Sequence, residues 1–133
     1  MRTGAPLPVS DENTSAVIYR HPDVNLAFRY WHDCLHVLRG LDFTPPQELQ
    51  LTMIQLGALE QAGWDPETLA WRLLHADLVG QVYLSAVGRR FPDNQREFVL
   101  NSLALGLEQA ILLELADVAS CTLQAPRGEP AAA

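Results

Sequence analysis

The sequence predicts an all-α fold: a single, four-helix bundle-like domain with disordered tails at its N- and C-termini. Three observations lead to this prediction. Apolar residues recur at the spacing of amphipathic helices through most of the 133 residues. Glycine and proline divide that pattern at Gly40, Gly63 and Pro92, where helices are expected to end. No stretch shows the alternation of apolar and polar residues that is typical of a half-buried strand.

The first helix is predicted over residues 21–39. Pro22 suits the first helical position, where its missing N–H group is not needed, and Asp23 complements the positive end of the helix dipole. Gly40 follows as the residue that ends the helix. Because the connection over residues 41–44 is short, the first two helices are expected to form an antiparallel hairpin.

The second and third helices are each preceded by a capping signal. The second is predicted over residues 44–63, with Thr44 as the cap and Gln47 as its capping-box partner. The third is predicted over residues 65–90, with Asp65 as the cap. Both helices carry apolar residues along one side, so both should contribute to the core.

The last helix is predicted over residues 94–120. Its most apolar part, residues 98–115, is interrupted by polar side chains and is therefore expected to be a buried helix and not a membrane span. The domain should cover residues 16–122. A flexible leader is expected over residues 1–15 and a disordered tail over residues 123–133.

Composition restricts the partners and the compartment. The chain has 16 acidic and 9 basic residues, a net charge of −7, and no lysine. Such a chain repels phosphate backbones and anionic lipids, which argues against both nucleic acid and an anionic membrane surface as partners. The first residues have neither the basic region nor the apolar run of a signal peptide. Cys34 and Cys121 lie far apart in apolar helical stretches, which favours buried free thiols in a reducing cytoplasm over a disulfide.

Four potential metal ligands gather at the predicted hairpin: His32, Asp33, His36 and Glu48. The two histidines are one helical turn apart, and Asp33 lies within the same narrow arc. The hairpin would bring Glu48, in the first turn of the second helix, beside His36. Two imidazoles and two carboxylates can bind a divalent metal, and zinc is our first choice. Alternatively, these residues are a solvated polar face, with Glu48 complementing the helix dipole.

The same residues resemble a known protein family. His32-Asp33, two residues, His36, eleven residues and Glu48 look like the signature of the Coq-four family of ubiquinone (coenzyme Q) biosynthesis proteins, as do the flanking segments 29–31 and 37–40. The resemblance implies a role in handling a prenylated aromatic ring or another isoprenoid lipid, with oxidative decarboxylation at ring carbon one. It also implies a zinc-type ion that binds the ring carboxylate or activates water, and a cytoplasmic location that could be peripheral to the membrane.

Two other function classes stay open. A metal-dependent phosphohydrolase of the HD type would use the adjacent histidine and aspartate of the motif, with His36 or His75 and Asp117 as further ligands. A non-catalytic binding or scaffold module would use the cluster as a structural site, and its apolar helices for homo-oligomerisation. His75 and Asp77 could supply an outer ligand or an acid–base group, or could form a satisfied polar spot between helices.

Overall fold

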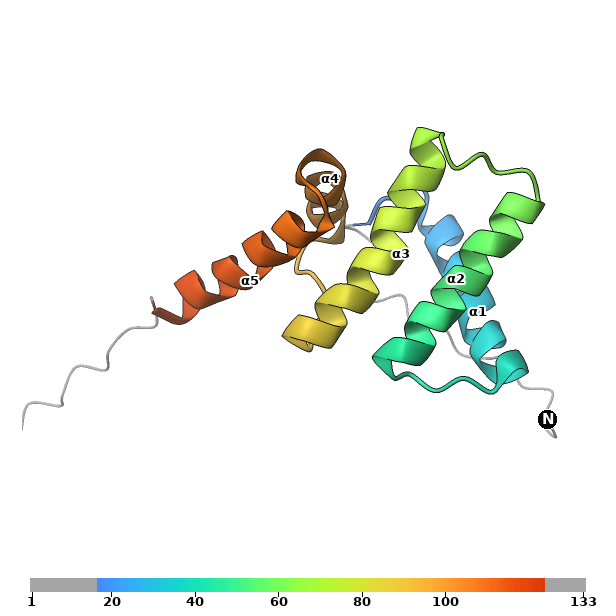
Figure 1. The fold of residues 1–133 in the computed structure, drawn as a ribbon, viewed down its shortest axis with the longest axis horizontal. Helices are drawn as coiled ribbons and strands as arrows, with labels where there is room; N and C mark the ends of the chain where they lie inside the picture. The colour runs from blue at the N-terminus through green and yellow to red at the C-terminus, as the bar shows by residue number, and fades with distance from the viewer. Residues whose placement is uncertain (1–16, 124–133) are drawn as a thin grey trace, which may run out of the picture.

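The computed structural model describes residues 17–123, with side chains as far as residue 116, and the chain is all-α as predicted (Figure 1). The helices of this part are α1 (Pro22–Arg39), α2 (Pro45–Gln61), α3 (Leu69–Gly88), α4 (Gln95–Leu105) and α5 (Leu107–Leu123). No strand occurs within the described range. The predicted leader lies outside the described residues, as does the predicted tail apart from residue 123, the last residue of α5.

The first two helices form the predicted hairpin. Gly40 ends α1 with a φ of 63°, a left-handed conformation that glycine adopts without a steric penalty. α2 begins at Pro45 after the expected Thr44, but the Thr44 side chain makes no capping hydrogen bond. Gln47 instead accepts a hydrogen bond from the backbone N–H of Asp42 through its Oε1 atom. The capping box is therefore replaced by a contact that ties the connection to the start of α2.

The third helix begins at Leu69, later than predicted. The hydroxyl of Thr68 is the cap, and it accepts a hydrogen bond from the N–H of Trp71. Asp65 forms a turn instead, because its carboxylate accepts a hydrogen bond from the N–H of Glu67 and its carbonyl accepts one from the Thr68 hydroxyl. Aspartate side chains compete with helical hydrogen bonding in this way, so Asp65 opens a turn and the helix starts after it.

The prediction of one helix over residues 94–120 is wrong, because Gly106 divides that segment into α4 and α5. The expected cap at its start is present: the Asn94 side chain accepts a hydrogen bond from the N–H of Glu97. Gly106 has a φ of 92° and a ψ of 154°, a conformation that glycine adopts far more readily than other residues. The apolar periodicity continues on both sides of this glycine, which hides the break in the sequence. Within the described range, no helix is both long and apolar enough to cross a membrane.

α3 is the central helix of the described part. It packs on α2 at one side and on α4 and α5 at the other (Figure 1). Two apolar clusters fill these contacts, one of Leu56, Leu74, Leu78 and Val79 and one of Leu84, Phe98 and Ala110. Gly80 permits the close approach of α4, since a Cβ atom at this position would lie 2.7 Å from the Phe98 ring. The core thus holds α3 in place between the α1–α2 hairpin and the C-terminal helices.

Candidate metal centre

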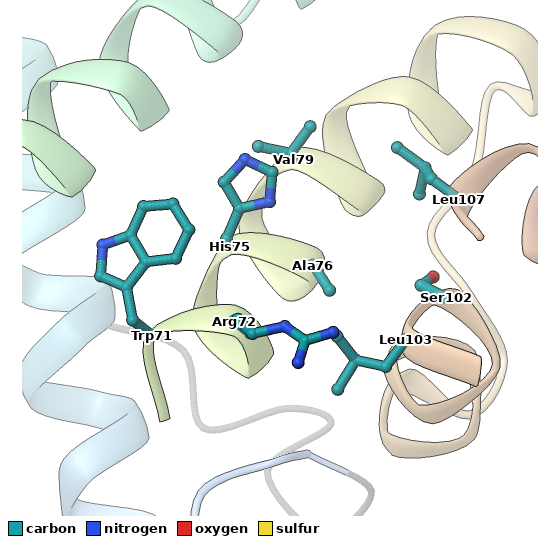
Figure 2. Close-up of a pocket in the computed structure, with 8 residues that line it drawn as sticks. All are labelled: Trp71, Arg72, His75, Ala76, Val79, Ser102, Leu103 and Leu107. Atoms are coloured by element: carbon teal, nitrogen blue, oxygen red, sulfur yellow. The ribbon is translucent and has the colours of Figure 1, made fainter. Parts of the chain in front are cut away.

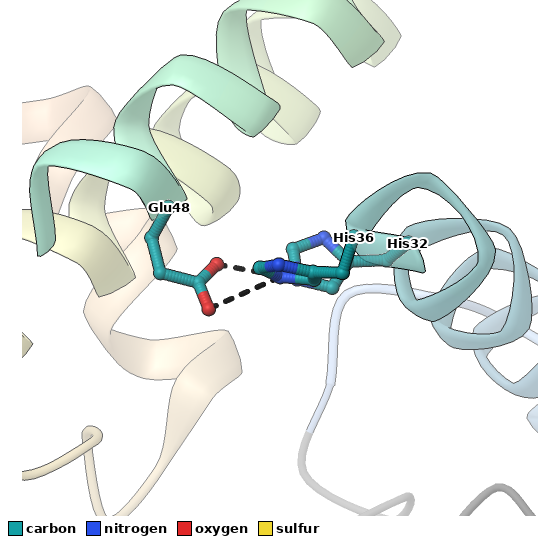
Figure 3. A group of neighbouring side chains, drawn as sticks. All are labelled: His32, His36 and Glu48. Atoms are coloured by element: carbon teal, nitrogen blue, oxygen red, sulfur yellow. Dashed lines mark hydrogen bonds and ion pairs between the residues drawn. The ribbon is translucent and has the colours of Figure 1, made fainter. Parts of the chain in front are cut away.

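Three of the four predicted ligands converge between α1 and α2 (Figure 3). His32 and His36 project from successive turns of α1, and Glu48 faces them from the first turn of α2. The Nε2 atoms of the two imidazoles lie 3.1 Å apart. The Glu48 oxygen Oε2 lies 3.2 Å from Nε2 of His32, and Oε1 lies 3.2 Å from Nε2 of His36. Each imidazole thus lies beside a different carboxylate oxygen, and one ligand atom from each residue lies within 4.8 Å of those of the other two.

Hydrogen bonds on the far side of each imidazole determine which ring nitrogen carries the proton. Nδ1 of His36 lies 3.0 Å from the carbonyl oxygen of Leu41, which can only accept, so this nitrogen donates. Nδ1 of His32 lies 3.1 Å from Oε1 of Gln55, which is also an acceptor. In a neutral ring with its proton on Nδ1, the Nε2 atom has a free lone pair. The atoms that meet at the centre are therefore all hydrogen-bond acceptors.

These acceptors fit a divalent cation. Acceptors in close contact repel one another unless a proton or a metal ion lies between them. Around tetrahedral zinc, with ligands at about 2.0–2.1 Å, neighbouring ligand atoms are about 3.3 Å apart. The separation of the two Nε2 atoms, 3.1 Å, and the separation of each Nε2 atom from its own Glu48 oxygen, 3.2 Å, are close to that value. Each histidine also makes the outer Nδ1 hydrogen bond that metal-ligating histidines almost always make.

The pKa shifts in the cluster favour a proton on His32 and a negative charge on Glu48. Burial lowers the pKa of His32. Two effects raise it by more: hydrogen bonds with Glu48 and Gln55, and the negative charges of Glu48 and Asp33. The pKa of His32 therefore lies above its usual value. Burial raises the pKa of Glu48. The hydrogen bond with His32 and the charges of both histidines lower this pKa by more than burial raises it, so the pKa of Glu48 lies below its usual value. A proton and a metal ion therefore compete for this site.

Asp33, the fourth predicted ligand, does not belong to this group. It is half-buried and lines the same cavity as His32 and Glu48. His36, in contrast, is 4% exposed, and it is one of the two buried residues of α1 together with Asn25. Asn25 and His36 are polar residues, so the polar side of α1 faces the interior at these two positions. The alternative of a solvated polar face is wrong for His36.

The centre borders a cavity of about 880 Å³. Its walls come from the segment before α1, from α1, α2, α3 and the start of α4, and from the connections between α1 and α2 and between α3 and α4. Part of the lining is apolar, contributed by Phe28, Leu78, Val82 and Phe91. The polar lining away from the centre includes Tyr19, Asp77, Gln81 and Gln95. The cavity can therefore hold a ligand that is largely apolar and carries a few oxygen atoms.

Sequence reasoning missed Gln55, which is 0% exposed and accepts the hydrogen bond from His32. A signal was available, because Gln55 follows Glu48 by seven residues, or two helical turns, and so lies on the same face of α2. Its amide Nε2 is buried without a hydrogen-bond partner in the described part, so the metal centre uses only the acceptor end of the amide. The Leu41 carbonyl carried no such signal, since every residue has one.

His75 lies apart from the metal centre and lines a second cavity of about 290 Å³ (Figure 2). Its ring stacks on Trp71, with centroids 5.0 Å apart and planes 24° from parallel. Burial lowers the pKa of His75, and the charge of Glu60 offsets this only in part. Asp77 instead lines the larger cavity beside the metal centre. The side chain of Asp117 is outside the described part of the chain.

In comparisons with protein-family models, curated proteins and solved structures, nothing matches this chain. A proposal about function therefore depends on three features: the geometry of the centre, the cavity, and the resemblance of the motif. An HD-type phosphohydrolase would need the aspartate beside the first histidine as a ligand. Since Glu48 and not Asp33 joins the two histidines, no described contact favours that class.

Replacing Gln55 tests the role of the outer hydrogen bond. We expect Gln55→Leu to weaken metal affinity about 10- to 100-fold, because His32 loses the acceptor that keeps its proton on Nδ1. Gln55→Glu retains an acceptor at the same place and should stay much closer to the original affinity. Competition with a chromophoric zinc chelator measures both. Equal affinities for the leucine and glutamate variants would contradict this role.

Proposed function

We propose that the chain is a metal-dependent enzyme that holds a zinc-type ion through His32, His36 and Glu48 and acts on a prenylated aromatic ring. The observation that carries the metal part is the convergence of two imidazoles and one carboxylate: the two Nε2 atoms are 3.1 Å apart, and each lies 3.2 Å from one Glu48 oxygen. The resemblance of the motif to the Coq-four family supports the ring part. Such a substrate partitions into lipid, so we place the protein in the cytoplasm at the periphery of the membrane.

The number of protein ligands supports a catalytic site over a structural one. Structural zinc sites use four protein ligands, whereas catalytic sites use three and leave a position for water or substrate. Among the residues that the structure describes, the group has three members, and Asp33 is outside it. When bound, the ion would supply a Lewis acid for a substrate oxygen or would lower the pKa of a bound water.

Apolar side chains of the cavity would bind the aromatic ring. Phe28, Val82 and Phe91 line the cavity that begins at His32 and Glu48, so an apolar ring can lie against them with its polar substituent toward the centre. The volume of about 880 Å³ lies in the range of cavities that enclose small-molecule ligands. These side chains would displace water from the ring and orient it.

The first test is metal content. Protein purified without a histidine tag is expected to contain about one zinc-type ion per chain by elemental analysis, or to take up that amount on reconstitution. If the protein contains no metal after reconstitution, the proposed metal site, and with it the proposed function, is contradicted.

The second test is the reaction itself. Metal-loaded protein is incubated in air with a 3-prenylated 4-hydroxybenzoate, and mass spectrometry follows loss of the ring carboxylate. We expect the product to appear with the loaded protein and not with a metal-free sample. A bound ion without any change of the ring would contradict the enzymatic part, and the centre would then be a structural site in a non-catalytic module.

A further inference from the structure

Asp77 is a buried carboxyl group on α3 that the metal centre does not use. It is 1% exposed and lines the cavity that also contains His32 and Glu48. Two side-chain amides donate hydrogen bonds to its Oδ1 atom: Nε2 of Gln81 at 2.9 Å and Nε2 of Gln95 at 2.6 Å. Within the described residues, no donor is bound to the other oxygen, Oδ2.

This hydrogen-bond pattern leaves one oxygen of Asp77 available to carry a proton. In the protonated group, one oxygen is a carbonyl that accepts hydrogen bonds and the other is a hydroxyl that donates one. Asp77 forms no ion pair with a cation in the described part. Burial raises its pKa to about 6, although the hydrogen bonds from Gln95 and Gln81 act in the opposite direction. A carboxyl group with such a pKa gains or loses a proton close to neutral pH.

The surroundings of Asp77 are polar on the cavity side. The titratable and charged groups that line the same cavity come from every element around it: Tyr19, Arg29, His32, Asp33, Glu48 and Asp93. Burial raises the pKa of Tyr19 and the charge of Asp77 raises it further, so this phenol stays protonated. The Tyr19 hydroxyl is buried and has no hydrogen-bond partner in the described part. Among the described residues, the Tyr19 hydroxyl and the second oxygen of Asp77 thus have no hydrogen-bond partner, and both lie on elements other than those that carry the candidate metal ligands.

We propose that Asp77 is a second polar anchor of the cavity, which takes up a proton and donates it in a hydrogen bond to an oxygen atom of a bound aromatic acid. Gln81 and Gln95 fix the orientation of the carboxyl group by occupying Oδ1. The inference rests on the proposed function for the other end of the ligand, at the metal centre. If both ends of the cavity bind the same ligand, the substrate carries oxygen substituents at two separate positions, as a hydroxylated ring acid does.

Proton uptake on binding tests this inference. Zinc-loaded protein is titrated with 4-hydroxybenzoate at pH 7 by calorimetry, in two buffers with different heats of ionisation. We expect close to one proton to be taken up per bound molecule, because Asp77 is largely ionised before binding and protonated after it. Asp77→Asn, which always donates, should bind without proton uptake. Asp77→Leu, which cannot donate, should bind about tenfold more weakly.

The control is Asp93→Asn, which changes another carboxylate that lines the cavity but whose side chain is 87% exposed. It should take up as many protons as the original protein. Binding without proton uptake, uptake that persists in Asp77→Asn, or no binding of the probe to the zinc-loaded protein would overturn the inference. Metal content is measured in every sample, so a failure of the metal centre is detected separately. Carbon NMR titration of metal-free protein then tests Asp77 alone, and an ordinary pKa there would also overturn it.

Discussion

His36→Ala is expected to abolish metal binding. His36 supplies the most buried of the three ligand atoms, and its Nε2 lies within 3.2 Å of both other ligand residues. Loss of an outer hydrogen bond weakens metal sites about 10- to 100-fold, so loss of a ligand should weaken this one by more than about 100-fold. Zinc at about 100 times its dissociation constant should stabilise the original protein by about 2.7 kcal/mol, and this stabilisation should vanish in the variant.

The measurement is metal content by elemental analysis, together with thermal unfolding with and without added zinc. His75→Ala is the matched control, because this histidine also lies on a helix but lines the other cavity (Figure 2). The control should keep its metal and its zinc-dependent increase in Tm. If His36→Ala retains one ion per chain, or if both alanine variants lose it, the centre is not formed by the residues that we assign to it.

Phe98→Ala is expected to destabilise the fold by about 3–5 kcal/mol, which is a large part of the stability of a domain of this size. The Phe98 ring is 2% exposed and lies against Gly80, where α4 crosses α3. Removing it leaves a void beside Leu84 and Ala110 in the C-terminal core cluster. Because Gln95 is on the same helix, its hydrogen bond with Asp77 should weaken as well.

Urea unfolding, monitored by circular dichroism, measures the free energy of unfolding of this variant. Phe91→Ala is the control, since Phe91 is 65% exposed and its loss should change stability by only about 0.5 kcal/mol. A similar small change for Phe98→Ala would show that α4 is not packed on α3 as described. Metal content should be retained by both variants, because neither residue is one of the three candidate ligands.

Local sequence signals predicted the hairpin and three members of the metal centre. The conformation of Gly40, the start of α2 at Pro45 and the one-turn spacing of His32 and His36 depend on the residues next to them. A short connection between two helices leaves few ways to pair their ends. The position of Glu48 beside the histidines therefore follows from the local sequence.

Other features were decided only by tertiary structure. Whether Asp33 joins the ligands depends on the rotation of α1 against α2, and local spacing allows either arrangement. The break at Gly106 depends on the packing of α4 and α5 around α3, because the apolar pattern is the same for one helix or two.

The cavity is the clearest example of what sequence alone left open. Asp77 and Gln95 come from α3 and α4, and a hydrogen bond between residues 18 positions apart has no periodic signature in the chain. Sequence alone determined the first two helices and the chemistry of the short motif, because both arise from contacts within one or two turns. The shape of the cavity and the partners of Asp77 depend on how helices that are distant in the sequence pack against one another. Only the folded structure specifies that packing.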